Sequence, residues 1–211
     1  MPRIAACALL TAAALAAGCG NERADSGSVF NAQAGKGTQA LSYPDAGLEV
    51  NLPKEFDVKP ASAPQLFRAS LDASFVSSFV YRRKEQIPKT RDELAAARRR
   101  LVAAATRRDK TFRLTRSRVT EVGGAPAIEL LGDQTIFKGR LRLRSLHVYK
   151  GNGEYVIELV APVAAFRGLE RSTFPAIQRS LRVSGEVKES KTEKSGSREP
   201  ASSAPSSTTG D

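Results

Sequence analysis

The sequence predicts an α+β fold, in which one antiparallel β-sheet is covered by helices. Four β-prone stretches between residues 112 and 161 follow one another with only short turns between them. Those turns are Gly123-Gly124, Lys138-Gly139 and Gly151-Asn152-Gly153, and strands joined so closely pair antiparallel. Helical segments stand before and after these strands, so layers of helix can cover the sheet.

The first half of the domain contributes three short strands and one helix. Residues 48–52 alternate apolar and polar side chains up to Pro53, which predicts a strand with a defined end. Residues 67–71 and 75–81 are two further β-prone stretches. Thr90 and Glu93 have the spacing of a capping box, and apolar residues recur behind them at helical spacing, which predicts a helix ending near Asp109.

The second half supplies the four strands and a final helix. The predicted strands are 112–122, 127–137 with a bend at Gly132, 141–149, and 155–161, the last of which Pro162 ends. The final helix is predicted over residues 174–181, with Pro175 in its first turn, and a shorter helical turn is expected at 164–169.

Cys19 is the residue that indicates where the protein works. It follows Leu15-Ala16-Ala17-Gly18, and Arg3 and an apolar stretch precede that run, which is the layout of a bacterial lipoprotein signal peptide. The apolar stretch is too short to span a hydrocarbon core of about 30 Å as a helix. We therefore expect lipid attachment at Cys19, with a palmitate among the acyl chains, and anchoring to the outer face of the bacterial cell membrane. A hydrophobic N-terminal helix of a cytosolic protein and secretion without a lipid remain alternatives.

Composition divides the chain into four parts. We expect a signal peptide at 1–18, a flexible tether at 19–40, one folded domain at 41–184 and a disordered tail at 185–211. Cys7 and Cys19 are the only cysteines, so the folded domain can have no disulfide, thiolate metal site or cysteine nucleophile.

Positive charge is concentrated in the middle of the chain. The net charge is +11, and between residues 82 and 150 there are 19 Lys and Arg against 7 Asp and Glu. Arginines alternate with leucines in one predicted strand, and two more stand on its expected neighbour, which predicts a cationic stripe for phosphate, anionic lipid or an acidic partner. These candidates are Arg116, Arg118, Arg140, Arg142 and Arg144. A merely solvated strand face is the simpler alternative.

Two other features can be interpreted as structural or as functional. Arg98, Arg99, Arg100, Arg107 and Arg108 lie on the predicted helix, where they either face solvent or contact anionic head groups. His147 is expected to be a structural histidine on the strand face of Leu141 and Leu143. A lone histidine does not make a typical zinc site, and a Ser-His-Asp hydrolase would need supporting motifs that the sequence lacks.

The order of motifs resembles the PsbP-like superfamily. Tyr43-Pro-Asp-Ala-Gly47 leads into Leu48-Glu-Val-Asn-Leu-Pro53, which is similar to the opening of that family, although Phe56 stands where a tryptophan is common. Gly124-Ala-Pro-Ala127 and the run from Tyr155 to Pro162 match later family features. The resemblance implies an α/β/α sandwich that acts as a binding or assembly module, and it transfers no catalytic residue.

Two functions follow as expectations. The first is a non-catalytic, lipid-anchored envelope module that presents a basic face to an anionic partner or membrane. The second is a small-ligand-capture lipoprotein with a pocket between sheet and helices. We expect no cofactor and no metal, and nucleic acid is not an expected partner because an exported location and the shortage of aromatic side chains argue against it.

Overall fold

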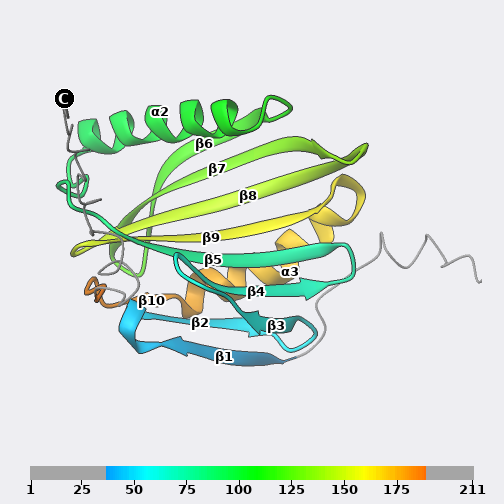
Figure 1. Cartoon of the computed structure of the whole chain (residues 1–211), viewed down its shortest axis with the longest axis horizontal. Coiled ribbons are helices and arrows are strands. Elements are labelled where there is room, and N and C mark those ends of the chain that lie inside the picture. The colour runs from blue at the N-terminus through cyan, green and yellow to red at the C-terminus, as the bar shows by residue number, and fades with distance from the viewer. Residues whose placement is uncertain (1–36, 189–211) are drawn as a thin grey trace, which may run out of the picture.

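The computed structural model describes residues 37–188, which form two β-sheets and two α-helices (Figure 1). A seven-stranded antiparallel sheet has the order β3-β4-β5-β9-β8-β7-β6, and a small sheet has the order β1-β2-β10. The strands outside the meander are β1 (Thr38–Tyr43), β2 (Leu48–Pro53), β3 (Asp57–Pro60), β4 (Gln65–Leu71), β5 (Ser74–Arg82) and β10 (Arg182–Val183). A 3-10 turn, η1 (Pro44–Ala46), joins β1 to β2.

The predicted meander is confirmed. It consists of β6 (Arg113–Val122), β7 (Ala125–Ile136), β8 (Gly139–Lys150) and β9 (Gly153–Pro162), and each strand pairs antiparallel with the next. The predicted capping box is also present at the start of α2 (Arg91–Arg108). There the Glu93 amide donates to Thr90 Oγ1 at 3.2 Å, and Glu93 Oε2 accepts from the Thr90 amide at 2.9 Å.

The final helix is longer than predicted, because α3 (Val163–Ser180) is one continuous helix with Pro175 inside it. The prediction of a separate helix starting at residue 174 is therefore wrong. Proline removes one backbone hydrogen bond and crowds the preceding turn. Packing offsets that cost, since Phe166 and Leu169 before the proline and Phe174 and Ile177 around it are all buried on one side of the helix.

The ordered part of the chain also extends beyond the expected limits at both ends. Strand β1 begins at Thr38, inside the segment expected to be tether, because it pairs with β2 from Thr38–Pro53 to Tyr43–Leu48. After β10, the Gly185 amide donates to the Tyr155 hydroxyl at 3.1 Å, and the Lys188 amide donates to the Asp45 carbonyl at 3.1 Å. The expected signal peptide, Cys19 and most of the tether and tail lie outside the described residues. No helix within residues 37–188 is long and apolar enough to cross a bilayer.

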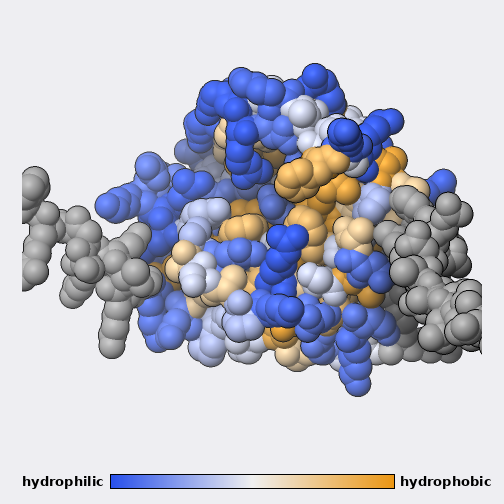
Figure 2. Space-filling model, turned by 45° about the vertical axis from the view of Figure 1, so that its right-hand side comes forward, coloured by the Kyte–Doolittle hydropathy of each residue, from blue (hydrophilic) through white to orange (hydrophobic). Residues whose placement is uncertain are grey.

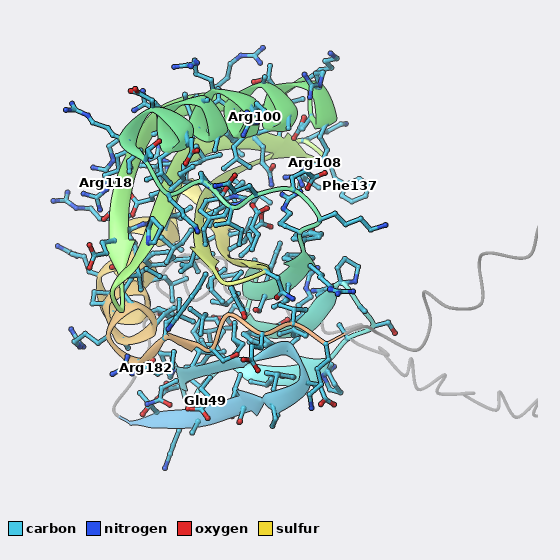
Figure 3. All side chains as sticks on the ribbon, turned by 90° about the vertical axis from the view of Figure 1, so that its left-hand side faces the viewer. Glu49, Arg100, Arg108, Arg118, Phe137 and Arg182 are labelled. Atoms are coloured by element: carbon cyan, nitrogen blue, oxygen red, sulfur yellow. The ribbon has the colours of Figure 1, made fainter. Side chains whose placement is uncertain are left out.

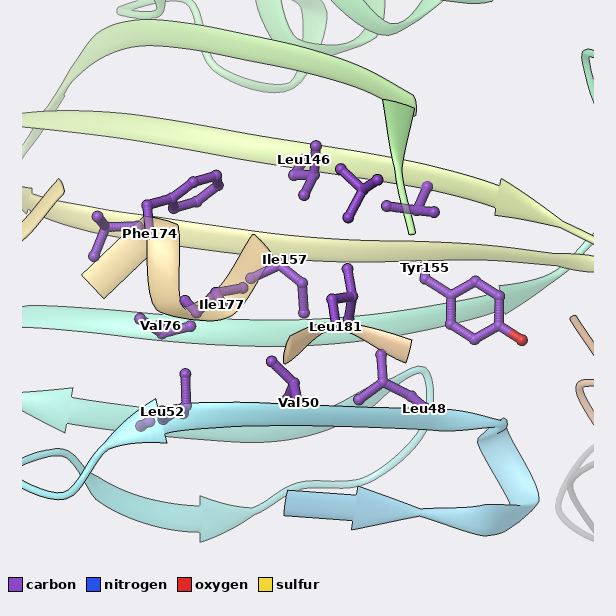
Figure 4. Packing of buried hydrophobic residues seen from close by; sticks show 14 of the residues in the cluster. Leu48, Val50, Leu52, Val76, Leu146, Tyr155, Ile157, Phe174, Ile177 and Leu181 are labelled. Carbon is purple, nitrogen blue, oxygen red and sulfur yellow. The ribbon is translucent and has the colours of Figure 1, made fainter. Parts of the chain in front are cut away.

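Two apolar layers hold the domain together. The main core lies between the seven-stranded sheet, α3 and β2, and includes Leu52, Ile157, Phe174 and Ile177, each fully buried (Figure 4). On the opposite face, α2 packs over β6 and β7 with a smaller cluster that includes Leu94. The large sheet therefore has an α3 side and an α2 side, and alternate residues of each strand belong to one or the other.

Candidate anion-binding surface

The five predicted arginines lie together on the α3 side of the sheet, where carboxylates of the same chain bind them. Arg144 on β8 contacts Glu129 on β7, with Nη2 at 2.5 Å from Oε2, and its Nη1 lies 2.9 Å from Glu170 of α3. Arg118 and Arg116 on β6 reach Glu129 Oε1 from the other side, at 3.1 and 3.4 Å. Glu129 was not among the residues predicted from the sequence, although an acidic residue within an apolar strand is a recognisable signal of a buried ion pair.

The second half of this cluster is built around Asp133 of β7. Arg142 makes a bidentate contact to it, with Nε at 2.6 Å from Oδ1 and Nη2 at 3.0 Å from Oδ2. Arg140 lies further out, with Nη2 at 3.5 Å from Oδ2. The sheet register explains the contact, because Asp133 stands directly opposite Arg142 on β8.

The pKa values of both carboxyl groups reflect their surroundings. Burial acts to raise the pKa of Glu129, but the hydrogen bonds and charges of Arg144 and Arg118 outweigh it, so that the pKa is lowered. The hydrogen bond from Arg142 holds the pKa of Asp133 below its ordinary value. Both groups are therefore charged at neutral pH, and these internal carboxylates relieve the mutual repulsion of the arginines.

The outer arginines of the cluster remain available to solvent. The Arg140, Arg116 and Arg118 side chains are 73%, 52% and 49% exposed, whereas the Arg144 side chain is only 10% exposed. Five guanidinium groups face the three carboxylates of Glu129, Asp133 and Glu170, so the cluster keeps a positive excess. Its inner part stabilises the domain, and its outer part can contact a ligand.

Helix α2 adds the larger share of free positive charge. Its exposed arginines form no ion pair within residues 37–188; they are Arg91, Arg99, Arg100, Arg107 and Arg108. The helix lies beside β6, and Arg98 Nη1 donates to the Ser117 carbonyl at 3.5 Å. Figure 3 shows Arg118 at the β6 edge of the sheet and Arg100 on α2, which lies above the sheet in this view. We call the exposed arginines of α2 the basic surface.

A hydrogen-bonded row of polar side chains lies on the α2 side of β8 and β9. Ser145 Oγ is 3.2 Å from His147 Nε2, and His147 Nδ1 is 2.7 Å from Glu154 Oε1. Arg83 pairs with the other oxygen of Glu154, and Tyr149 donates to Oε1 at 3.4 Å. His147 shares its strand face with Leu141 and Leu143, as predicted.

This row has the order of a hydrolase triad, but a substrate has no access to its serine hydroxyl. Ser145 is 2% exposed and Glu154 is 1% exposed, so a substrate cannot reach the hydroxyl. Burial lowers the pKa of His147 to about 3, and the charges of Arg83 and Arg108 act in the same direction. The neutral ring and its partners satisfy one another inside the domain, which is a structural role.

Hollows on the domain surface do not favour ligand capture. One of about 440 Å³ lies at the end of β2 and β10, where four of its lining residues are charged: Glu49, Arg182, Glu186 and Lys188. Another of about 290 Å³ lies beside the segment leading into α2, just below the usual range of ligand pockets. The space between the sheet and α3 is filled by the main core. Within the described part of the chain, His, Asp and Glu side chains form no cluster suited to a metal ion.

Comparisons with known proteins identify the fold. No protein-family description and no curated protein matches the sequence. Among solved structures, cyanobacterial PsbP (CyanoP) from Synechocystis sp. PCC 6803 aligns with a TM-score of 0.54 at 14% identity, over 69% of this chain and 92% of that one.

A second structure is LpqN of Mycobacterium tuberculosis, described as involved in cell envelope biogenesis. It aligns with a TM-score of 0.52 at 12% identity, over 70% of this chain and 90% of that one. The α+β prediction is confirmed, and the resemblance read from the sequence holds at the level of architecture: this chain has the PsbP-like fold.

Proposed function

We propose that this protein is a non-catalytic binding or assembly module of the cell envelope, tethered by a lipid on Cys19. The observation that carries the proposal is the basic surface, whose α2 arginines have no carboxylate partner among residues 37–188. Fold alone does not assign a function. An envelope role agrees, however, with the likeness to LpqN and with the lipoprotein layout of the N-terminus.

Electrostatics favours an anionic partner. Helix α2 carries six arginines against Asp92 and Glu93, and Glu93 is occupied by the capping box. Guanidinium groups bind phosphate and carboxylate through paired hydrogen bonds, so a row of them can hold either an acidic polymer or an anionic lipid surface. Like charges gathered on one helix repel each other, and a bound anion relieves that repulsion.

Binding should be tested with the full chain carrying Cys19→Ser, so that the lipid does not mask weaker contacts. We expect binding to phosphatidylglycerol vesicles or to polyglutamate that falls steeply between about 50 and about 200 mM salt. Comparing these two ligands distinguishes a lipid surface from an acidic polymer. Binding that is independent of salt, or absent, would reject the basic surface as the contact.

The matched variants reverse two charges each. Arg99→Glu with Arg100→Glu on α2 should abolish salt-dependent binding, whereas Arg167→Glu with Arg171→Glu on exposed positions of α3 should leave most of it intact. Equal loss in both variants would mean that net charge, and not this surface, drives binding. The anchor is tested separately, by incorporation of labelled palmitate into the native chain and its absence in Cys19→Ser.

A further inference from the structure

The β7–β8 hairpin extends past its neighbours at one end of the sheet. Strand β6 stops pairing with β7 at Asp133, and β9 stops pairing with β8 at Pro162 opposite Leu141. Residues 134–140 therefore form a two-stranded projection, and every residue from Thr135 to Arg140 is exposed. We call this segment the finger.

The tip of the finger has an unusual residue for its conformation. Phe137 and Lys138 form the turn with φ values of 48° and 73°, a pair of left-handed conformations that two-residue hairpins usually fill with Asn-Gly. A bulky side chain in this region costs free energy. Phe137 is also 99% exposed and Ile136 beside it is exposed, so packing within the domain does not offset that cost.

Cations surround this apolar tip. Lys138 and Arg140 belong to the finger itself, and Lys110 lies in the loop whose Thr111 contacts it, since the Thr135 amide donates to Thr111 Oγ1 at 2.9 Å. Figure 1 shows the C-terminal end of α2, which carries Arg108, at the same end of the molecule as the β7–β8 hairpin. Figure 2 brings this end forward and shows hydrophobic surface directly below the hydrophilic surface of α2.

The same end of the molecule receives the N-terminal segment. Strands β2 and β7 both point toward it (Figure 1), and Gly37 lies beside the end of β2, where its carbonyl accepts from the Lys54 amide at 3.3 Å. Cys19 precedes Gly37 by 18 residues, a length that spans at most roughly 60 Å. A lipid on Cys19 would thus hold this end of the domain close to the bilayer.

We propose that the finger is a membrane-docking element, in which Phe137 and Ile136 enter the interfacial region of an anionic bilayer and the surrounding cations bind its head groups. The inference rests on the proposed lipid tether. An exposed aromatic side chain beside basic residues suits this boundary, because the ring gains apolar contact while the charges stay in the aqueous layer. The unusual turn then places the ring at the tip of the finger.

Insertion can be measured directly because the chain has no tryptophan. Phe137→Trp in the full lipidated chain, reconstituted into vesicles of equal phosphatidylcholine and phosphatidylglycerol, should show blue-shifted emission and quenching by lipids brominated on their acyl chains. The control is Tyr81→Trp, a 38% exposed aromatic position that pairs with Glu154 near the opposite end of the strands. It should show neither effect. A solvent-like, unquenched spectrum at position 137 would overturn the inference.

A second variant separates docking from folding. Phe137→Asn suits a left-handed turn, so the domain should melt at the native temperature or above it. Vesicle partitioning of the Cys19→Ser chain should nevertheless fall by roughly tenfold, since an apolar anchor is lost. Unchanged partitioning would reject the finger as an anchor.

The two proposals fail in different ways. If tryptophan at 137 stays in water while salt-dependent binding through α2 persists, only the finger is rejected. If salt-dependent binding is absent while tryptophan at 137 inserts, the basic surface is rejected and the finger stands.

Discussion

Glu129 should be the most sensitive polar position of the domain, and Glu129→Gln tests this. The Glu129 side chain is 1% exposed and holds Arg144, which is itself 10% exposed. The Arg144 guanidinium also lies over the Phe174 ring at 3.9 Å, and its Nε is buried without a hydrogen bond within the described residues. Arg144 therefore has little freedom to turn toward water when its partner is changed.

The expected loss follows from that confinement. Breaking a buried ion pair by removing one partner costs about 3–5 kcal/mol. Glutamine keeps one oxygen acceptor, and Glu170 still binds Arg144 Nη1, so we expect the lower end, about 3 kcal/mol. For a domain of this size that loss lowers the melting temperature by about 6–12 °C. The Arg116 and Arg118 side chains are half exposed and can return to solvent, so they add little.

Equilibrium unfolding in urea measures this change. The control is Asp133→Asn, whose partners Arg140 and Arg142 are more exposed than Arg144, and there we expect a loss of only about 1 kcal/mol. The double variant Glu129→Leu with Arg144→Met should recover most of the lost stability, because no unpaired charge remains buried. A loss below about 1 kcal/mol in Glu129→Gln, or a double variant no better than the single one, would refute the reasoning.

Three further predictions concern the turns, the helix start and the lone histidine. Gly151→Ala should lower the free energy of unfolding, measured in urea, by more than about 2 kcal/mol, because an added Cβ would meet the Gly185 carbonyl. The control is Gly124→Ala, which also has a positive φ but has open space around the added Cβ, and it should cost only about 1 kcal/mol. Thr90→Ala should cost about 1 kcal/mol by removing the cap of α2, and a change below about 0.3 kcal/mol would contradict its role. The pKa of His147 is about 3 in the folded domain against 6.5 for the free side chain, so the unfolded chain binds the extra proton between these values. The contribution of His147 to stability should be complete above pH 6.5 and be lost at up to about 1.4 kcal/mol per pH unit below it. Burial raises the pKa of Glu158, so its proton uptake in the folded domain opposes that loss, and His147→Gln should remove the His147 slope.

The sequence predicted the part of the fold that local signals determine. Turn residues and alternating side chains were sufficient to predict the meander, although the β7–β8 turn lies at Phe137-Lys138, one residue before the predicted Lys138-Gly139. The Thr90–Glu93 spacing was sufficient to predict the start of α2. Strand β10 was missed because two residues carry no periodicity of their own, and they are ordered by pairing with Glu49 and Leu48 and by burial of Val183 in the main core. The start of the final helix was predicted wrongly for a related reason: burial of α3 in the core outweighs the preference of Pro175 for the first turn of a helix.

The site was predicted as a group of arginines but without their partners. The alternation of Arg140, Arg142 and Arg144 correctly indicated one strand face, because a strand has period two. Which carboxylates face them depends on the register of β7 against β8, which a two-residue turn at Phe137 and Lys138 sets. Glu170 comes from α3, and no local pattern connects that helix with β8.

The two ends of the described chain also fix how the domain carries a mechanical load. At the N-terminal end of β1, Gly37 is hydrogen-bonded to Lys54. Just beyond the C-terminal end of β1, Lys188 is held by Asp45, with Nζ at 2.8 Å from Oδ1. A pull between an anchored N-terminus and a partner on the C-terminus is therefore directed along β1 and shears its six residue pairs with β2 together, instead of unzipping them in turn. In single-molecule pulling, this domain should resist more force between its own termini than between Gly37 and a handle attached at Pro53, the residue paired with Thr38.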